Sequence, residues 1–532
     1  MSNEPVTKKE SDSGSSDLLA SSAAVGSMTM TSRVFGLIRD VVIARFIGAS
    51  DAADAFFVAF RIPQFLRRLF AEGAFAQAFV PVLSEYREQR DFEQVKALVN
   101  AVCGVLGGTL IMIVGLVVAA APLVTMVFAP GFIDQPDKFE LTSSMLQITF
   151  PYLLLISLTG FAGAVLNSYD RFVVPAFTPV LLNLSLIGFA LFVSPLMNQP
   201  VYALAWGVLF AGVLQLFFQL PFLARLQLLP RPTWNTQHEG VRKIMLLMLP
   251  AVFGVSVSQI NLLLDSVLAS LLPSGSVSWL YYSDRLAELP LGVFGIAIAT
   301  VILPGLSRLS TADDPAKFKH TLDWALTCIV LVAIPAMAAL VMLSGPILFT
   351  LFQYGATTIR DIAMSSASLS AYALGILAFM AIKVLAAGYF SRQDMRTPVR
   401  FGIIAMVANM VFNLIFVALF HFKWQMGHVG LALATSLSAY LNASLLFFGL
   451  KRHFGDSLLT QRFWISLVRV VFATVVMCGV LFSLAPAASF WEFASAWERI
   501  VEILLLCSAG LLVYAAALFA AGQRLGGLRS PT

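Results

Sequence analysis

Apolar runs of about 20 residues recur along the whole chain, and each is long enough to cross a bilayer as a helix. Inside a bilayer the backbone must satisfy its own hydrogen bonds, so a crossing segment is a helix or a strand of a closed barrel. Barrel strands are short and alternate in polarity, whereas these runs are long and continuously apolar. Charged residues make up only 12% of the 532 residues. The sequence therefore predicts an all-α polytopic membrane protein.

We predict fourteen transmembrane helices, and the loop charges set their orientation. Loops on the N-terminal side carry most of the lysines and arginines, while the opposite loops carry only Lys138, Arg360, Lys423 and Arg499. Because positively charged loops stay in the cytoplasm, both termini are expected there. The same loops account for the net charge of +5 without a nucleic-acid partner. The four cysteines lie inside apolar runs and lack the spacing of a metal site or a disulfide framework.

The chain also repeats itself. "VPVLSEYR" (80–87) aligns with "LPGLSRLS" (303–310) at an offset of 223, and Asp40 aligns with Asp265 at 225. Matches in order at a nearly constant offset indicate two six-span halves around a central cavity, as in two-lobed transporters. We expect a disordered cytoplasmic tail (1–20), an N-terminal lobe (21–226), a C-terminal lobe (227–450) and a final segment with two further spans (451–532).

Charged residues within the first spans point to an anionic ligand. The stretch "SRVFGLIRDVVIARF" (32–46) places Arg33 on one helix face with Asp40, and Ser32 on another with Arg39. A charge at a helix centre costs about 2.5–3.5 kcal/mol even on the lenient insertion scale, so such residues usually face a watery cavity or one another. Arginine binds phosphate through a fixed fork of donors and stays charged.

The second half repeats this chemistry in "SGSVSWLYYSDRLAELP" (274–290), where Ser278 and Arg285 share a face and Glu288 follows. Arginines from both halves predict a site for an anionic head group, a phosphate or pyrophosphate. Asp40, Asp54 and Glu288 would limit the net positive field. For Arg45 and Lys383, a side chain that reaches the membrane surface from a span end is an equal alternative.

Four long stretches resemble the MurJ (MviN) family of lipid II flippases, within the MOP exporter superfamily. They are "SMTMTSRVFGLIRD", "DAFFVAFRIPQFLRRLFAEGAFAQAFVPVLSEY", "GSVSWLYYSDRLAELPLGVFGIAIATVILPGLS" and "YFSRQDMRTPV". The resemblance covers the chain from about residue 20. One departure is Gln64, where the family usually has asparagine after the proline.

The resemblance implies a multi-pass protein of the bacterial cytoplasmic (inner) membrane that acts by alternating access. It would move lipid II, an undecaprenyl-pyrophosphoryl disaccharide-pentapeptide, from the inner to the outer leaflet for peptidoglycan synthesis. Two six-helix lobes would enclose a cationic cavity, and helices 13 and 14 would form a groove for the lipid tail. The family's substrate-binding positions correspond here to Arg33, Arg39, Arg67, Arg285, Ser32, Asp40, Asp54, Ser278 and Glu288.

Two other function classes fit parts of the sequence. Another MOP-superfamily exporter, for a different polyprenyl-linked glycan or for small molecules, would share the fold, although a cation exporter would favour carboxylates over arginines. An intramembrane enzyme would need a positioned acid, nucleophile or metal, and the five histidines lie in loops or at span ends without ligand spacing. We therefore expect a transporter whose partners are lipid II and membrane lipids.

No cofactor is expected, and the energy source is left between two possibilities. A P-loop is absent from the sequence, so ATP is not expected to drive the cycle. Asp265, Asn409 and Asn413 could offer oxygen ligands to Na⁺, or they could simply form interhelical hydrogen bonds. A membrane potential acting on the cationic cavity would also serve, at roughly 2.3 kcal/mol per charge per 100 mV.

Overall fold

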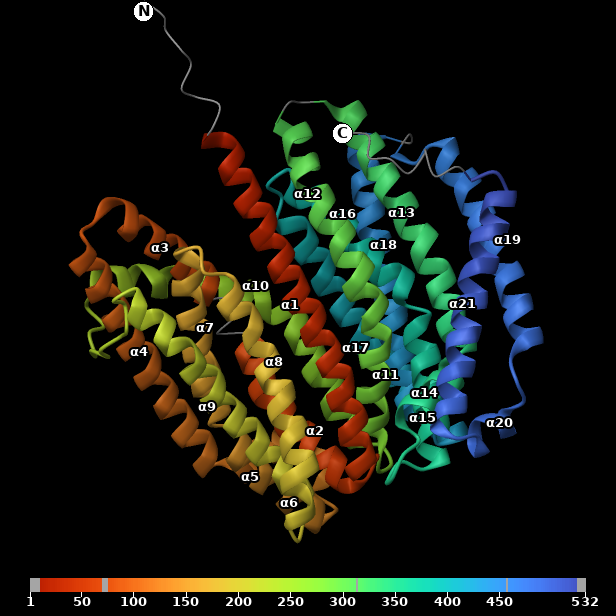
Figure 1. Ribbon diagram of the computed structural model, residues 1–532, viewed down its shortest axis with the longest axis horizontal. Coiled ribbons are helices and arrows are strands. Elements are labelled where there is room, and N and C mark those ends of the chain that lie inside the picture. Colours follow the sequence, from red (N-terminus) through yellow and green to blue (C-terminus); the bar gives the residue numbers. More distant parts are fainter. Residues whose placement is uncertain (1–9, 69–74, 312–313, 456–457, 524–532) are drawn as a thin grey trace, which may run out of the picture. The chain divides into compact units, whose positions relative to one another are not determined.

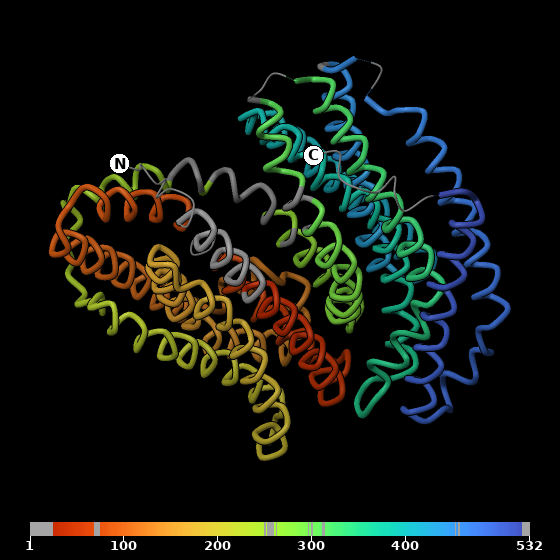
Figure 2. The backbone as a smooth tube through the Cα atoms, turned by 45° about the horizontal axis from the view of Figure 1, so that its top comes forward, coloured from red at the N-terminus to blue at the C-terminus, as the bar shows by residue number. Residues whose placement is uncertain are grey.

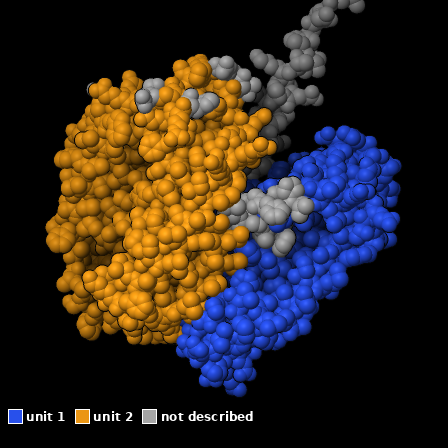
Figure 3. Space-filling model, turned by 180° about the vertical axis from the view of Figure 1, so that it is seen from behind, with its two compact units in different colours: residues 1–47, 51–259 blue, residues 48–50, 260–532 orange. Residues whose placement is uncertain are grey.

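The structure is a computed structural model that describes residues 10–68, 75–311, 314–455 and 458–523. Every regular element within these ranges is helical, and no strand occurs among them. The chain divides into two units, Met1–Ile47 with Asp51–Gln259 and Gly48–Ser50 with Ile260–Thr532 (Figure 3). The all-α prediction is confirmed.

Unit 1 pairs helices that are distant in the sequence as well as neighbouring ones. Helix α1 packs on α8, α2 packs on α6, and both α7 and α8 pack on α9 (Figure 1). Aromatic rings fill the core between α3, α4 and α7, where Phe79 lies 5.1 Å from Phe75 and 5.3 Å from Phe161. The helices are α1 (Glu10–Ile47), α2 (Asp51–Leu66), α3 (Phe75–Gln89), α4 (Phe92–Ala119), α5 (Ala121–Phe128), η2 (Pro130–Phe132), α6 (Pro136–Thr149), α7 (Tyr152–Ser168), α8 (Val173–Gly188), η3 (Phe189–Val193), η4 (Ser194–Leu196), α9 (Val201–Arg225) and α10 (Glu239–Ser270), which continues into unit 2.

Unit 2 also pairs both neighbouring and distant helices. Helix α17 packs along α18, α11 packs on α15, and α13 packs on α16 and α19. Asp394 precedes α17, and hydrogen bonds from Thr397 hold the pKa of this carboxyl below its usual value. The helices are α11 (Ser276–Pro290), η5 (Leu291–Gly295), α12 (Ile296–Thr311), α13 (Pro315–Met342), α14 (Ser344–Phe352), α15 (Ile359–Ala373), α16 (Ile376–Phe390), α17 (Arg396–Trp424), α18 (Gly427–Phe454), α19 (Gln461–Leu484), α20 (Ala488–Phe493) and α21 (Ala496–Ala520).

The last two long helices, α19 and α21, pack against each other in unit 2 (Figure 2). The Tyr514 hydroxyl on α21 donates to the Leu331 carbonyl of α13, at 2.7 Å. At the start of α19, the backbone and hydroxyl of Thr460 donate to the buried carboxylate of Asp323, at 2.8 and 3.0 Å. The other faces of α19 and α21 carry exposed apolar side chains, for example Phe482 (80% exposed) and Leu512 (69% exposed). A membrane would cover such faces with hydrocarbon.

Length and composition make ten of the described helical segments candidate membrane spans. They are α4, α6 with α7, α8 with η3 and η4, α9, α13, α15 with α16, α17, α18, α19 and α21. Helices α2 and α11 have only 16 and 15 residues, and α1 carries four charges between Arg33 and Arg45. The chain is therefore an integral membrane protein, while the number fourteen stays a prediction.

One helix begins earlier than the sequence suggested. We predicted a disordered tail over residues 1–20, whereas α1 already begins at Glu10. The stretch from Leu18 to Ala24 is rich in leucine and alanine, which favour helix. Residues 1–9 lie outside the described residues.

Candidate functional site

The first cluster of predicted site residues lies between α1 and α8. Arg39 is only 7% exposed, and its Nε and Nη2 donate to Oδ1 of Asp40 at 2.9 and 2.7 Å. Its Nη1 donates to Oδ1 of Asn183 on α8, at 3.0 Å, and Nδ2 of Asn183 donates to the Ser32 carbonyl, at 2.9 Å. Ser32, Arg39 and Asp40 are therefore joined in one network. Asn183 was missed, although a polar residue inside an apolar run is a signal for such a role.

Arg33, one turn and a half before Arg39, has a different environment. Its side chain is half-buried, and no hydrogen bond or ion pair joins it to another residue of the described chain. Arg67 directly follows α2 and is also half-buried. Because Arg33 has no such partner in the described chain, its guanidinium keeps all five N–H donors available for a ligand.

Asp54 lies near the start of α2 and contacts a cation from α6. Nζ of Lys138 lies 3.0 Å from Oδ2 of Asp54 and 2.7 Å from Oδ1 of Asp51. The side chains of Lys138 and Asp54 are 4% and 2% exposed, and Nζ lies 4.4 Å from the centre of the Phe132 ring. We expected Lys138 in a loop, but it belongs to α6 and is buried because these two carboxylates compensate its charge.

Three predicted residues of unit 2 lie on α11. Nη1 of Arg285 is 3.3 Å from Oε2 of Glu288, and the guanidinium lies over the Tyr281 ring at 5.1 Å. The side chains of Arg285 and Glu288 are 28% and 48% exposed, so this ion pair stabilises the protein by about 1 kcal/mol or less. A more strongly bound anion can therefore replace Glu288. Ser278 is fully buried. Hydrogen bonds from Trp279 to Asp361 and from Ser283 to the Ser365 carbonyl fix α11 on α15.

The candidate cation ligands Asp265, Asn409 and Asn413 meet in the interior of unit 2. Nδ2 of Asn413 lies 2.8 Å from Oδ1 of Asp265 and 3.0 Å from Oδ1 of Asn409, whose own amide donates to Ser438. Both asparagines are fully buried, and Asp265 is 8% exposed. Oδ1 of Asn413 is buried without a hydrogen-bond partner in the described chain. The three residues thus form the interhelical bonds we considered, and they leave one spare oxygen that suits a hard cation.

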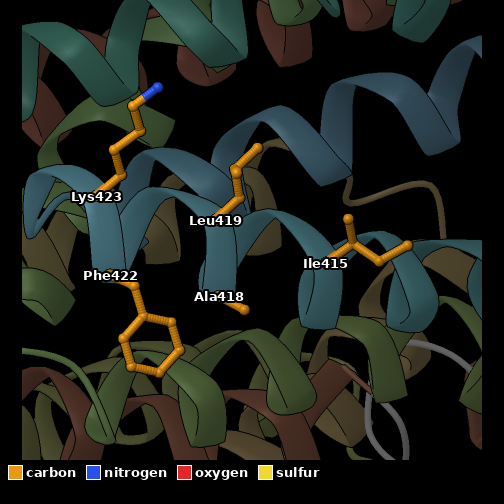
Figure 4. A pocket seen from close by; sticks show the side chains of 5 residues that line it. All are labelled: Ile415, Ala418, Leu419, Phe422 and Lys423. Atoms are coloured by element: carbon orange, nitrogen blue, oxygen red, sulfur yellow. The ribbon is translucent and has the colours of Figure 1, made fainter.

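A groove of about 640 Å³ runs along the C-terminal part of α17 (Figure 4). It is lined by Ile415, Ala418, Leu419, Phe422 and Lys423, none of which belongs to the predicted site. Four of these side chains are apolar, and Phe422 is 84% exposed. This surface suits hydrocarbon rather than a polar head group. The described residues contain no group of three His, Cys, Asp or Glu side chains that could hold a metal ion.

Comparisons with known proteins agree on one family. The family model "Lipid II flippase MurJ" matches residues 43–514. A "probable lipid II flippase MurJ" from Vibrio cholerae is 48% identical over 97% of this chain and 98% of its own length. The "lipid II flippase MurJ" of Burkholderia cenocepacia is 39% identical over 93% and 95%.

Solved structures agree with this relationship. A lipid II flippase MurJ in an inward closed conformation matches with a TM-score of 0.76 and 26% identity, over 93% of this chain and 97% of that one. An inward-facing MATE multidrug transporter of the MOP superfamily matches with a TM-score of 0.64, over 81% and 98%. At 13% identity, the second match shows a shared fold alone.

Proposed function

Because the chain belongs to the MurJ family of lipid II flippases, we propose that it moves lipid II from the inner to the outer leaflet of the bacterial cytoplasmic membrane. A flippase is a transporter and not an enzyme, as the sequence predicted. The proposal includes fourteen spans, six in each half and two beyond the repeat, with both termini in the cytoplasm. The substrate site would open to the two sides in turn.

The observation that carries this proposal is the state of Arg33. A half-buried guanidinium in an apolar helix is costly unless something compensates its charge, and no described residue bonds to it. A pyrophosphate would compensate that charge through charge-assisted hydrogen bonds. Arg39, Arg67 and Arg285 are the further proposed ligands. Ser32, Asp40, Asp54, Ser278 and Glu288 would hold these arginines or limit the net charge around them.

Two further parts of the proposal concern the lipid tail and the energy source. The exposed apolar faces of α19 and α21 would hold part of the polyprenyl chain. The cluster of Asp265, Asn409 and Asn413 would bind Na⁺, since carboxylate and amide oxygens are ligands that hard cations prefer. A membrane potential acting on the arginines is the alternative driving force.

Depletion of the protein in growing cells tests the function. Lipid II is labelled, and its outer-leaflet fraction is measured by its accessibility to an enzyme added from outside. We expect the outer fraction to fall while inner-leaflet lipid II accumulates. Unchanged outer-leaflet lipid II, together with loss of another polyprenyl-linked glycan from that leaflet, would instead identify an exporter of that glycan.

A further inference from the structure

Arg39 is held on one side by a carboxylate and on the other by a neutral amide. We propose that Asn183 is a positioning residue for the anionic substrate, which fixes the Arg39 guanidinium without adding negative charge. This inference rests on the proposed function, since it takes Arg39 as a ligand of the pyrophosphate.

The geometry leaves Asn183 a single orientation. Its Oδ1 accepts from Nη1 of Arg39 at 3.0 Å, and its Nδ2 donates to the Ser32 carbonyl at 2.9 Å. A flipped amide would set its NH₂ against the guanidinium and its oxygen against the carbonyl, so both bonds would be lost. Asn183 is 4% exposed, and it links α8 to two residues of α1, Ser32 and Arg39, that lie about two turns apart. The amide therefore sets the direction of the guanidinium as well as the packing of the helices.

The neutrality of the amide matters because the local excess of positive charge is small. Between Ser32 and Asp40, α1 carries two arginines and one aspartate, which leaves one net positive charge. A carboxylate at position 183 would bond Arg39 more strongly, yet it would cancel that charge. The bond to Arg39 alone would favour an acid here, but an acid would lose the bond to the Ser32 carbonyl, and binding of an anion requires a neutral acceptor.

The second half of the chain bonds an amide directly to the aligned carboxylate, whereas in the first half Arg39 bonds both the amide and the carboxylate. Asp40 aligns with Asp265, and Asn413 donates to Asp265 at 2.8 Å. At the same offset of 225, the position of Arg39 is occupied by Leu264. In each half an amide and the aligned aspartate belong to one hydrogen-bond network, and the network of the first half includes the guanidinium of Arg39. Because Asn413 and Asp265 join α17 to α10 without an arginine, helix packing does not require the charge at Arg39, and this favours a role in ligand binding.

The test compares lipid II affinity with thermal stability in purified protein. Wild type, Asn183→Asp, Asn183→Ala and Ser185→Ala are each titrated with fluorescently labelled lipid II, and each Tm is measured. We expect Asn183→Asp to raise the Kd for lipid II about tenfold or more, because the new carboxylate cancels one unit of positive charge near the anion. Asn183→Ala loses both bonds, so its Tm should fall further than that of Asn183→Asp. Its affinity for lipid II should fall less, because no negative charge is added. Ser185→Ala removes a bond from α8 to the Gly207 carbonyl (2.7 Å) and should lower Tm without changing Kd.

A charge swap separates charge from folding. The double variant Asp40→Asn/Asn183→Asp restores one carboxylate and one amide around Arg39, and it should recover most of the lost affinity. Wild-type affinity in Asn183→Asp would overturn the inference, as would a folded double variant without recovery. If Asn183→Asp does not fold, Asn183→Ala decides, because unchanged affinity there excludes a positioning role. A wild-type protein that does not bind lipid II would contradict the proposed function instead.

Discussion

The ion cluster around Lys138 gives a stability prediction that follows directly from burial. Lys138→Met removes the ammonium group and keeps an unbranched side chain. The carboxylate of Asp54, which is 2% exposed, then loses the Lys138 ammonium group that lies 3.0 Å from its Oδ2. Asp51 is 58% exposed, so water can replace its own contact with Lys138.

The magnitude follows from the buried member of the cluster. Removal of one partner from a buried ion pair costs about 3–5 kcal/mol. The contact to an exposed partner adds under about 1 kcal/mol, and the contact with the Phe132 ring adds a similar amount. We expect the free energy of unfolding to fall by at least about 3 kcal/mol.

Chemical unfolding in detergent, followed by tryptophan fluorescence, measures this loss. Lys423→Met is the matched control, since Lys423 is exposed, lies over the Trp424 ring at 4.7 Å and forms no ion pair with the described residues. It should change stability by under about 0.5 kcal/mol. The double variant Lys138→Met/Asp54→Asn should recover part of the loss, because no carboxylate is left buried at position 54. A loss below about 1 kcal/mol for Lys138→Met would refute a stabilising role of this pair.

Three further predictions concern topology, the lipid tail and the cation. In a cysteine-free background, a cysteine at exposed Gln135 should react with an impermeant thiol reagent from outside intact cells, and one at exposed Asn235 should not; outside labelling at Asn235 would reject the orientation. A photoreactive polyprenyl analogue should label α19 and α21, and labelling confined to α4 and α6 would exclude the tail groove. Asn413→Ala should abolish any dependence of lipid II transport on external Na⁺ at normal protein levels, whereas Asn442→Ala, one turn beyond Ser438, should retain it.

The spanning helices could be predicted because they depend on local pattern. Apolar runs specify spanning helices whatever their neighbours are. Asn409 and Asn413 lie one turn apart, so one face of α17 had to carry both amides, and the structure sets that face against Asp265. Such a meeting could be anticipated because a polar residue in an apolar run needs a polar neighbour.

Side-chain partners across helices could not be predicted in the same way, because they depend on how each helix is rotated. The spacing placed Asp40 on one face with Arg33, whereas the structure pairs Asp40 with the adjacent Arg39. Neither Asn183 nor Lys138 was assigned a role, since nothing in the sequence shows that α8 meets α1 or that α6 meets α2.

In the proposed function, Arg33, Arg39, Arg67 and Arg285 bind the head group of lipid II. The most direct measurement is the rate at which lipid II reaches the outer leaflet in cells that depend on an Arg285 variant. At wild-type protein levels, checked by immunoblotting, Arg285→Ala should abolish transport. Arg285→Lys should retain part of it, because the charge remains while the fork of donors is lost. Full transport by a well-expressed Arg285→Ala protein would contradict the claim.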